Sequence, residues 1–139
     1  MLVSCIMRRP VTTVTPDISV RAAAALMGEL GLGVLPVCDQ ARPVGIITDR
    51  DIVVRWVPNA MADGNIAPIM TPHVVTCSAD HSVEQAAYLM ADNQIRRLVV
   101  VDAAGDIAGI VTLGDIANDA NETLAGQTLG EIVETRCGY

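Results

Sequence analysis

Apolar residues recur with the spacing i, i+3, i+4, i+7 of an amphipathic helix after Ser19 and again after Ser82. The positions are Val20, Ala23, Ala24 and Met27 in the first stretch and Val83, Ala86, Ala87 and Met90 in the second. Serine is a favoured helix N-cap, and Gln85 completes a capping box with Ser82. The pattern predicts two helices whose alanines allow close packing.

Short runs rich in Val, Ile and Thr surround each predicted helix and indicate strands. They are Val11–Val14, Val34–Cys38 and the run into Gly45 in the first half, and Val74–Cys77, Leu98–Val101 and the run into Gly109 in the second. A further helix follows each glycine, and Pro58 is predicted to end the first of these. The element order is therefore strand, helix, strand, strand, helix, twice.

The two halves are a tandem duplication. Residues 6–39 match residues 69–102 at 14 of 34 positions, and after one extra turn residue the offset grows from 63 to 64. We predict a first repeat over 1–60, a linker over 61–68, a second repeat over 69–122 and a tail over 123–139. Residues 118–126 are expected to be a loose exit, and Thr128–Glu131 a capping box that opens a short helix.

A repeat of about 60 residues is too small to bury a good core alone. We therefore expect an α+β fold in which the two repeats pack face to face about a pseudo-twofold axis. The clefts between them would be lined by the first strand, the second strand and the turn after the third strand. This arrangement predicts two related pockets.

The stretch from Gly45 to Asp51 recurs from Gly109 to Asp115, and each copy ends in a threonine followed three residues later by an aspartate. We call the pair Thr48 and Asp51 the first corner and the pair Thr112 and Asp115 the second corner. Either corner fits a capping box, worth about 1 kcal/mol of helix stability. Each also fits a nucleotide site, because amides and a hydroxyl can bind phosphate and a carboxylate can accept ribose hydroxyls. The preceding glycine and the repetition favour the nucleotide site.

Charge and composition narrow the classes of partner. A net charge of -7 argues against nucleic acid, and 2% aromatic residues argue against base stacking. No apolar run approaches the roughly 20 residues that span a bilayer, so no membrane association is expected. Arg8 and Arg9 follow the apolar residues of the N-terminus, unlike a signal peptide, which favours the cytoplasm.

Taken together, several motifs resemble a pair of CBS domains, the regulatory repeats named after cystathionine beta-synthase. The motifs are Ile6-Met7 and Ile69-Met70, Ser19-Val20 and Ser82-Val83, Leu35-Pro36-Val37 and Leu98-Val99-Val100, and the two corners. The resemblance runs from Val3 to about Ala120. It implies a non-catalytic module that needs no cofactor and binds AMP, ADP, ATP or S-adenosylmethionine as a regulatory ligand. It also implies a homodimer, and an effector that is another polypeptide.

The resemblance assigns roles to individual residues. Asp51 and Asp115 would bind ribose, and Thr48 and Thr112 would lie near the phosphate or ribose. Arg97 would contact a phosphate, and because its counterpart is Val34, the two clefts should differ in anion affinity. The remaining site residues would supply backbone groups and aliphatic walls for the adenine, and they are Val11, Thr13, Val74 and Thr76. The sequence leaves open which of these two segments serves which aspartate.

Two other functions stay open. A ligand-free interaction or stress adaptor would follow if the clefts are empty. A thiol or metal sensor could use Cys5, Cys38, Cys77 and Cys137, although the cysteines lack Cys-x-x-Cys spacing and only Cys77 lies near the two histidines. Cys38 and Cys77 are most simply small buried apolar residues of strands. An enzyme is not expected, because no nucleophile has a neighbouring base.

Overall fold

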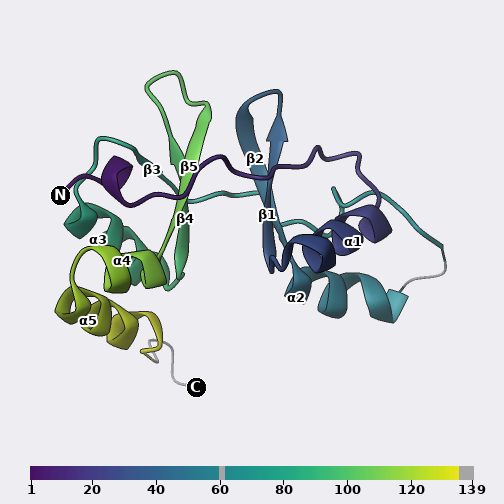
Figure 1. Ribbon diagram of the computed structural model, residues 1–139. Coiled ribbons are helices and arrows are strands. Elements are labelled where there is room, and N and C mark those ends of the chain that lie inside the picture. Colours follow the sequence, from purple (N-terminus) through teal and green to yellow (C-terminus); the bar gives the residue numbers. More distant parts are fainter. Residues whose placement is uncertain (60–61, 135–139) are drawn as a thin grey trace. The chain divides into compact units, whose positions relative to one another are not determined.

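The computed structural model describes residues 1–59 and 62–134, which form two compact units (Figure 1). The continuous unit is Thr12–Val74. The split unit combines Met1–Val11 with the described residues from Val75 onward. The units therefore differ from the repeats of the sequence, because each takes its leading segment from the other repeat.

The continuous unit contains one hairpin and two helical segments. Helix α1 (Val20–Leu30) is capped by Ser19, whose side chain accepts a hydrogen bond from the amide of Ala22, and ends at Gly31 with a φ of 66°. Strands β1 (Val34–Asp39) and β2 (Arg42–Thr48) pair antiparallel. The closing helix begins with α2 (Asp49–Asp51) and continues through a π-helical segment, η2 (Ile52–Trp56), and a 3-10 turn, η3 (Val57–Asn59).

The split unit repeats this order and adds elements at both ends. A 3-10 turn, η1 (Val3–Cys5), precedes strand β3 (Thr76–Ser78) and helix α3 (Val83–Asn93). Strands β4 (Arg97–Val101) and β5 (Ile107–Thr112) pair antiparallel, and β3 pairs with β4 in parallel. Helix α4 (Leu113–Asp119) closes the repeat, and helix α5 (Glu122–Ile132) packs against α3 and α4.

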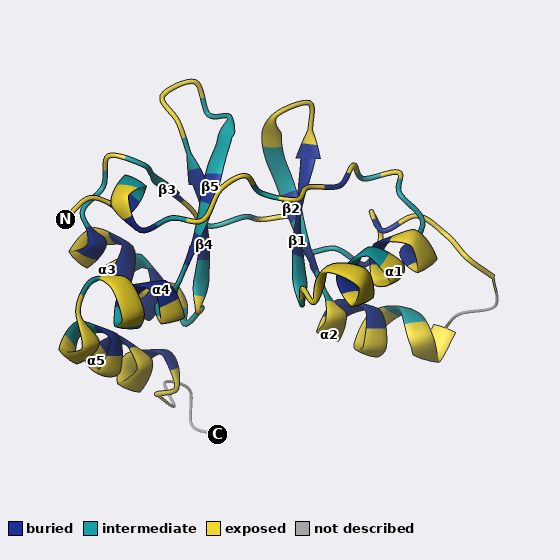
Figure 2. Cartoon of the chain, in the orientation of Figure 1, coloured by how far each residue is buried: buried dark blue, intermediate teal, exposed yellow. Residues whose placement is uncertain are grey.

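Each unit has its own apolar core, whose residues are among the dark blue segments of the helices and strands in Figure 2. In the continuous unit the core joins α1 to the hairpin through Ala23, Leu35 and Ile47, all 0% exposed. In the split unit Ala86, Leu98 and Val111 occupy the equivalent positions and are also 0% exposed. The predicted α+β class and the periodicity of the first helices are confirmed.

The structure corrects three expectations. The run Val11–Val14 is not a strand, since only Val14 forms an isolated parallel bridge, with Val37. The expected loose exit over 118–126 is wrong, because α4 continues to Asp119 and α5 begins at Glu122 after an Asn121 cap. Thr128 does not open a helix, because it lies inside α5 with its buried hydroxyl donating to the carbonyl of Leu124 at 2.7 Å.

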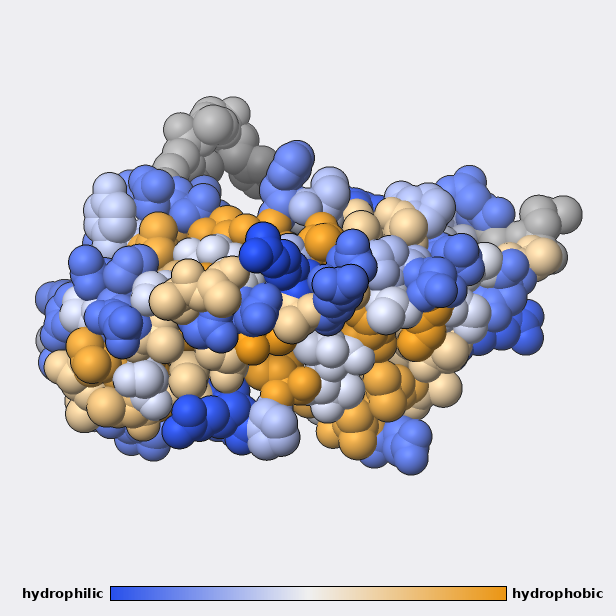
Figure 3. Space-filling view, turned by 90° about the horizontal axis from the view of Figure 1, so that it is seen from above, coloured by the Kyte–Doolittle hydropathy of each residue, from blue (hydrophilic) through white to orange (hydrophobic). Residues whose placement is uncertain are grey.

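Several apolar side chains of the described chain are exposed, and Figure 3 shows such side chains interspersed with hydrophilic ones on one face. In the continuous unit Val53, Val54 and Val57 are each more than half exposed. Within residues 1–59 and 62–134, every helix is too short or too polar to cross a bilayer.

Three sequence predictions fall on residues that the structure does not describe. They are the repeat boundary at 60–61, the last five residues of the tail, and Cys137.

Candidate functional site

Both corners are capping boxes in the structure. At the first corner the Thr48 hydroxyl accepts from the amide of Asp51 at 3.1 Å, and Oδ2 of Asp51 accepts from the amide of Thr48 at 3.0 Å. At the second corner the equivalent distances for Thr112 and Asp115 are 3.1 and 2.9 Å. The capping interpretation is thus confirmed, and it fixes each carboxylate where the sheet ends.

Both aspartates are buried, with Asp51 8% and Asp115 1% exposed. A buried carboxylate is costly unless it is paired or hydrogen-bonded. Nε of Arg8 donates to Oδ1 of Asp115 at 2.7 Å, whereas Nε of Arg55 lies 3.8 Å from Oδ1 of Asp51. Each corner therefore has an arginine partner, and the second corner has the tighter pair.

The two arginines come from different elements. Arg8 lies in the leading segment of the first repeat, and its counterpart at an offset of 63 is Thr71. Arg55 lies one turn beyond Asp51, and its counterpart at an offset of 64 is Asp119. The hydrogen bond with Asp115, and then the negative charge of that residue, raise the pKa of Arg8 above its ordinary value. Sequence reasoning missed both arginines. The differences between the repeats at these two positions are nevertheless visible in the sequence.

The leading segments reach the corners by pairing with the strands before them. The amide of Arg8 donates to the carbonyl of Ile110 at 2.8 Å, and the amide of Ile110 donates back at 3.1 Å. Thr71 and Ile46 pair in the same way, at 2.8 and 2.9 Å. The leading segment of the first repeat therefore lies beside the second corner, and the leading segment of the second repeat lies beside the first corner.

This crossing explains the glycine of each motif. A Cβ on Gly109 would lie 2.8 Å from Sδ of Met7 and 3.0 Å from the carbonyl oxygen of Arg8. A Cβ on Gly45 would lie 2.7 Å from Sδ of Met70 and 3.0 Å from the neighbouring carbonyl. The glycines are required because the leading segment passes directly over the strand.

Arg97 opens β4 and is the register partner of Thr112 on β5. Directly opposite residues of an antiparallel pair project from the same face of the sheet, so the half-buried Arg97 belongs to the surroundings of the second corner. At the first corner the corresponding register partner of Thr48 is Val34. The two corners therefore differ in charge at this position.

The four remaining predicted site residues lie in the leading segments. Thr13 and Thr76 are exposed, and Val11 and Val74 are half-buried. Thr76 begins β3 and is the register partner of Val99. Val11 ends the leading segment of the split unit, and Val74 is the last residue of the continuous unit. Among the described residues, none of these four side chains hydrogen-bonds to a corner.

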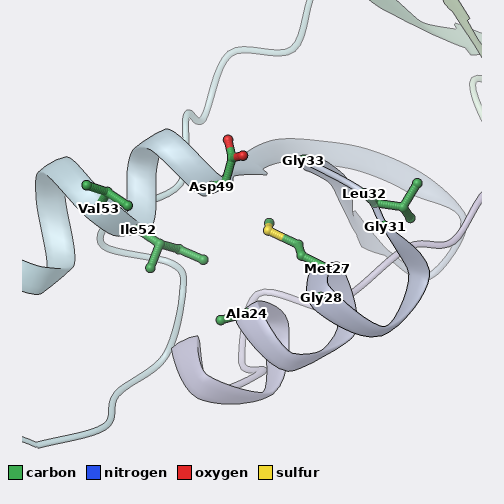
Figure 4. A pocket seen from close by; sticks show the side chains of 9 residues that line it. All are labelled: Ala24, Met27, Gly28, Gly31, Leu32, Gly33, Asp49, Ile52 and Val53. Atoms are coloured by element: carbon green, nitrogen blue, oxygen red, sulfur yellow. The ribbon is translucent and has the colours of Figure 1, made fainter.

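A separate hollow of about 530 Å³ lies between α1 and the closing helix of the continuous unit. Met27 of α1 and Ile52 of η2 point toward one another across it (Figure 4). Asp49 lines this hollow, whereas Thr48 and Asp51 do not. It is therefore a groove on the helical face of the unit and is distinct from the first corner.

The cysteines do not gather in the described part of the chain. Cys5 is exposed, while Cys38 and Cys77 are buried, and all three are free thiols. Burial raises the pKa of Cys38, and it raises the pKa of Cys77 to about 11. Within residues 1–59 and 62–134, no three side chains of the types His, Cys, Asp and Glu come close enough to share a metal ion.

Comparisons with known proteins agree with the tandem duplication. Residues 3–56 and 66–121 each match the family described as CBS domain. The CBS domain-containing protein YhcV of Bacillus subtilis (strain 168) is 38% identical over 129 residues, 91% of either chain. The solved CBS domain pair of protein MJ0100, in complex with 5'-methylthioadenosine and S-adenosyl-L-methionine, aligns at 32% identity with a TM-score of 0.76. That alignment covers 91% of this chain and 98% of the other.

A second solved structure, CBSX2 in complex with AMP, aligns at 28% identity with a TM-score of 0.76, over 88% of this chain and 97% of the other. The two matches to the family cover most of the 139 residues and contain both corners. The chain belongs to the CBS domain family and carries two copies of that domain.

Proposed function

We propose that the protein is a non-catalytic regulatory module that binds an adenosine-containing ligand at its Thr–Asp corners and passes the ligand state to a separate polypeptide. The observation that supports this most is the repetition of one buried carboxylate, held by a threonine at the end of a strand, in both repeats. Helix capping alone does not require burial of the aspartate in both copies.

The chemistry of the corners suits a ribose. An ionised aspartate accepts up to about four hydrogen bonds and can therefore receive both ribose hydroxyls. The threonine hydroxyl supplies a further polar contact, and Arg97 beside Thr112 offers a cation to a phosphate. Related structures contain 5'-methylthioadenosine with S-adenosyl-L-methionine, or AMP, so adenosine is the shared chemical group.

Isothermal titration calorimetry with AMP, ADP, ATP, S-adenosylmethionine and 5'-methylthioadenosine tests the proposal. A ligand that binds only the folded state raises the free energy of unfolding, by about 2.7 kcal/mol at a concentration of 100 Kd. At least one of the five is expected to bind with saturable heat and to raise the melting temperature.

The double variant Asp51→Asn/Asp115→Asn keeps the shape of both corners and removes their charge, so it should lose this binding. The matched control is Asp49→Asn/Asp119→Asn, which removes two neighbouring exposed carboxylates and should bind normally. Binding that survives the corner variant would refute the assignment of the corners. Absence of binding by all five ligands at millimolar concentration would favour the adaptor function.

The proposal includes a homodimer, as the family resemblance implies, and an effector of unknown identity. Sedimentation velocity, with and without the bound ligand, tests the first part. A monomer at all concentrations would remove the homodimer from the proposal while leaving ligand binding intact.

A further inference from the structure

We infer that Arg8 makes the two corners unequal: Asp51 is ready to accept a ribose, whereas Asp115 becomes available only after Arg8 leaves it. This inference rests on the proposed function and adds that an uncharged adenosine ligand fills the first corner alone. Its structural basis is the difference between the hydrogen bonds that the two carboxylates accept.

Asp115 has almost no accepting capacity left. Its Oδ2 accepts from the amide of Thr112 and from the hydroxyl of Thr112, both at 2.9 Å, which uses both lone pairs of that oxygen. Its Oδ1 accepts from Nε of Arg8 at 2.7 Å, and the side chain is 1% exposed. A ribose hydroxyl would therefore have to displace a partner of Asp115.

Asp51 is in a different state. Among the described residues, its Oδ2 accepts a hydrogen bond only from the amide of Thr48, at 3.0 Å. Its Oδ1 has Nε of Arg55 at 3.8 Å, which is too long for a hydrogen bond, and the side chain is 11% exposed. Among the hydrogen bonds of the described residues, none is donated by the Thr48 hydroxyl. Both polar groups of the first corner can therefore receive new partners.

Arg8 can leave Asp115 without disturbing the fold around it. Its backbone is fixed by two hydrogen bonds to Ile110, but its side chain is 70% exposed. Only Nε is used by Asp115, so the remaining four N–H donors of the guanidinium are available to solvent or to an anion. The equivalent residue at the first corner is Thr71, whose side chain is shorter and uncharged. An arginine of the leading segment therefore occupies the aspartate only at the second corner of the described chain.

The charge of the ligand decides whether Arg8 leaves Asp115. A phosphate can take over the guanidinium of Arg8 and has Arg97 beside Thr112 as a second cation. An uncharged nucleoside offers Arg8 no replacement for Asp115, so it gains little at the second corner. 5'-Methylthioadenosine is the direct probe because it carries a ribose and no phosphate.

Calorimetric stoichiometry with 5'-methylthioadenosine tests the inference. The wild-type protein should bind one molecule, and Asp51→Asn should abolish this binding. Arg8→Gln should bind two, with affinity at the second corner increased about tenfold or more, the effect of releasing one charged hydrogen bond. Arg8→Gln/Asp115→Asn should return to one molecule. Thermal unfolding of each variant verifies that it is folded.

A matched control isolates the role of Arg8. Arg9→Gln removes the neighbouring exposed arginine and the same net charge, and it should keep one site. Two equal sites in the wild type, loss of binding in Arg8→Gln, or no second site in Arg8→Gln would each overturn the inference. If AMP still binds through Asp51 or Asp115 in those cases, the proposed function survives.

Discussion

The two compact units share a helix, a hairpin and a closing helix in the same order, yet they are closed in different ways. In the split unit α5 covers α3 and α4, and Arg8 covers Asp115. In the continuous unit the equivalent helical face contains a groove, and Asp51 has no close partner on its Oδ1 among the described residues. A duplicated sequence has thus been specialised by helix α5, which follows the second repeat, and by one difference within the duplication, Arg8 in place of Thr71.

Equivalent core side chains of the two units differ in their exposed fraction. Met90 of α3 is 0% exposed and Ile116 of α4 is 0% exposed, while their counterparts Met27 and Ile52 are 5% and 8% exposed. The counterparts are the two side chains that meet across the groove. Because α5 adds Ala125 and Ile132 to the core of the split unit, that unit should be the more costly to disrupt.

The largest effect is expected from truncating the paired methionines. Met90→Ala should lower the free energy of unfolding by about 3–4 kcal/mol, because the cavity cannot collapse beneath α5. Met27→Ala should cost about 2 kcal/mol, since water and the open groove can accommodate the change. Urea unfolding measures both, and equal losses would show that α5 does not tighten its unit.

The next effect concerns the crossing of the leading segments. Gly109→Ala should lower the free energy of unfolding by about 1–3 kcal/mol, because its Cβ would meet Met7 and the Arg8 carbonyl at 3.0 Å or less. Gly114→Ala is the control, since its nearest neighbour would be the Thr112 hydroxyl at 3.5 Å and alanine favours a helix. Thermal unfolding should show a loss for the first variant only.

A smaller effect should separate the two aspartates. Asp115→Asn weakens three accepted hydrogen bonds, including that from Arg8, and should cost about 1 kcal/mol, limited by the exposure of Arg8. Asp51→Asn weakens one and should cost about half as much. Denaturant curves of both variants at neutral pH measure the difference, and a larger loss for Asp51→Asn would contradict the proposed order.

The smallest expected difference is in cysteine labelling under mild denaturant. Cys38 reports on the continuous unit and Cys77 on the split unit, and burial raises the pKa of both thiols. Cys38 should be alkylated about fivefold faster, corresponding to roughly 1 kcal/mol between the two openings. Peptide mass spectrometry resolves the sites, and exposed Cys5 should react first without denaturant.

The Cys77 thiol predicts that the free energy of unfolding depends on pH. Cys77 keeps its proton in the folded state up to about pH 11, whereas an exposed cysteine ionises at about 8.5. The unfolded state therefore binds fewer protons in this interval, and stability should fall as pH rises from 8.5 toward 11. Cys77→Ala should flatten that slope, while Cys5→Ala should leave it unchanged.

Periodicity and repetition were sufficient to predict α1, α3, both hairpins and the two corners, because these features depend on local spacing and on serine or threonine caps. The pairing of the leading segments was not predictable, since Arg8 and Ile110 lie far apart in the sequence. Helix α5 was missed because Thr128 and Glu131 resemble a capping box, although the helix begins earlier, after Asn121. Arg8 was missed because its partner lies in the other repeat.

The exchange of leading segments also determines the order in which the two units can fold during translation. Residues 12–74 form one unit without any later part of the chain, so this unit can fold while the rest is still being translated. Val3 and Ile6 are translated before this unit but bury their side chains among residues translated after it. The core of the split unit can therefore be completed only after the whole continuous unit has been translated.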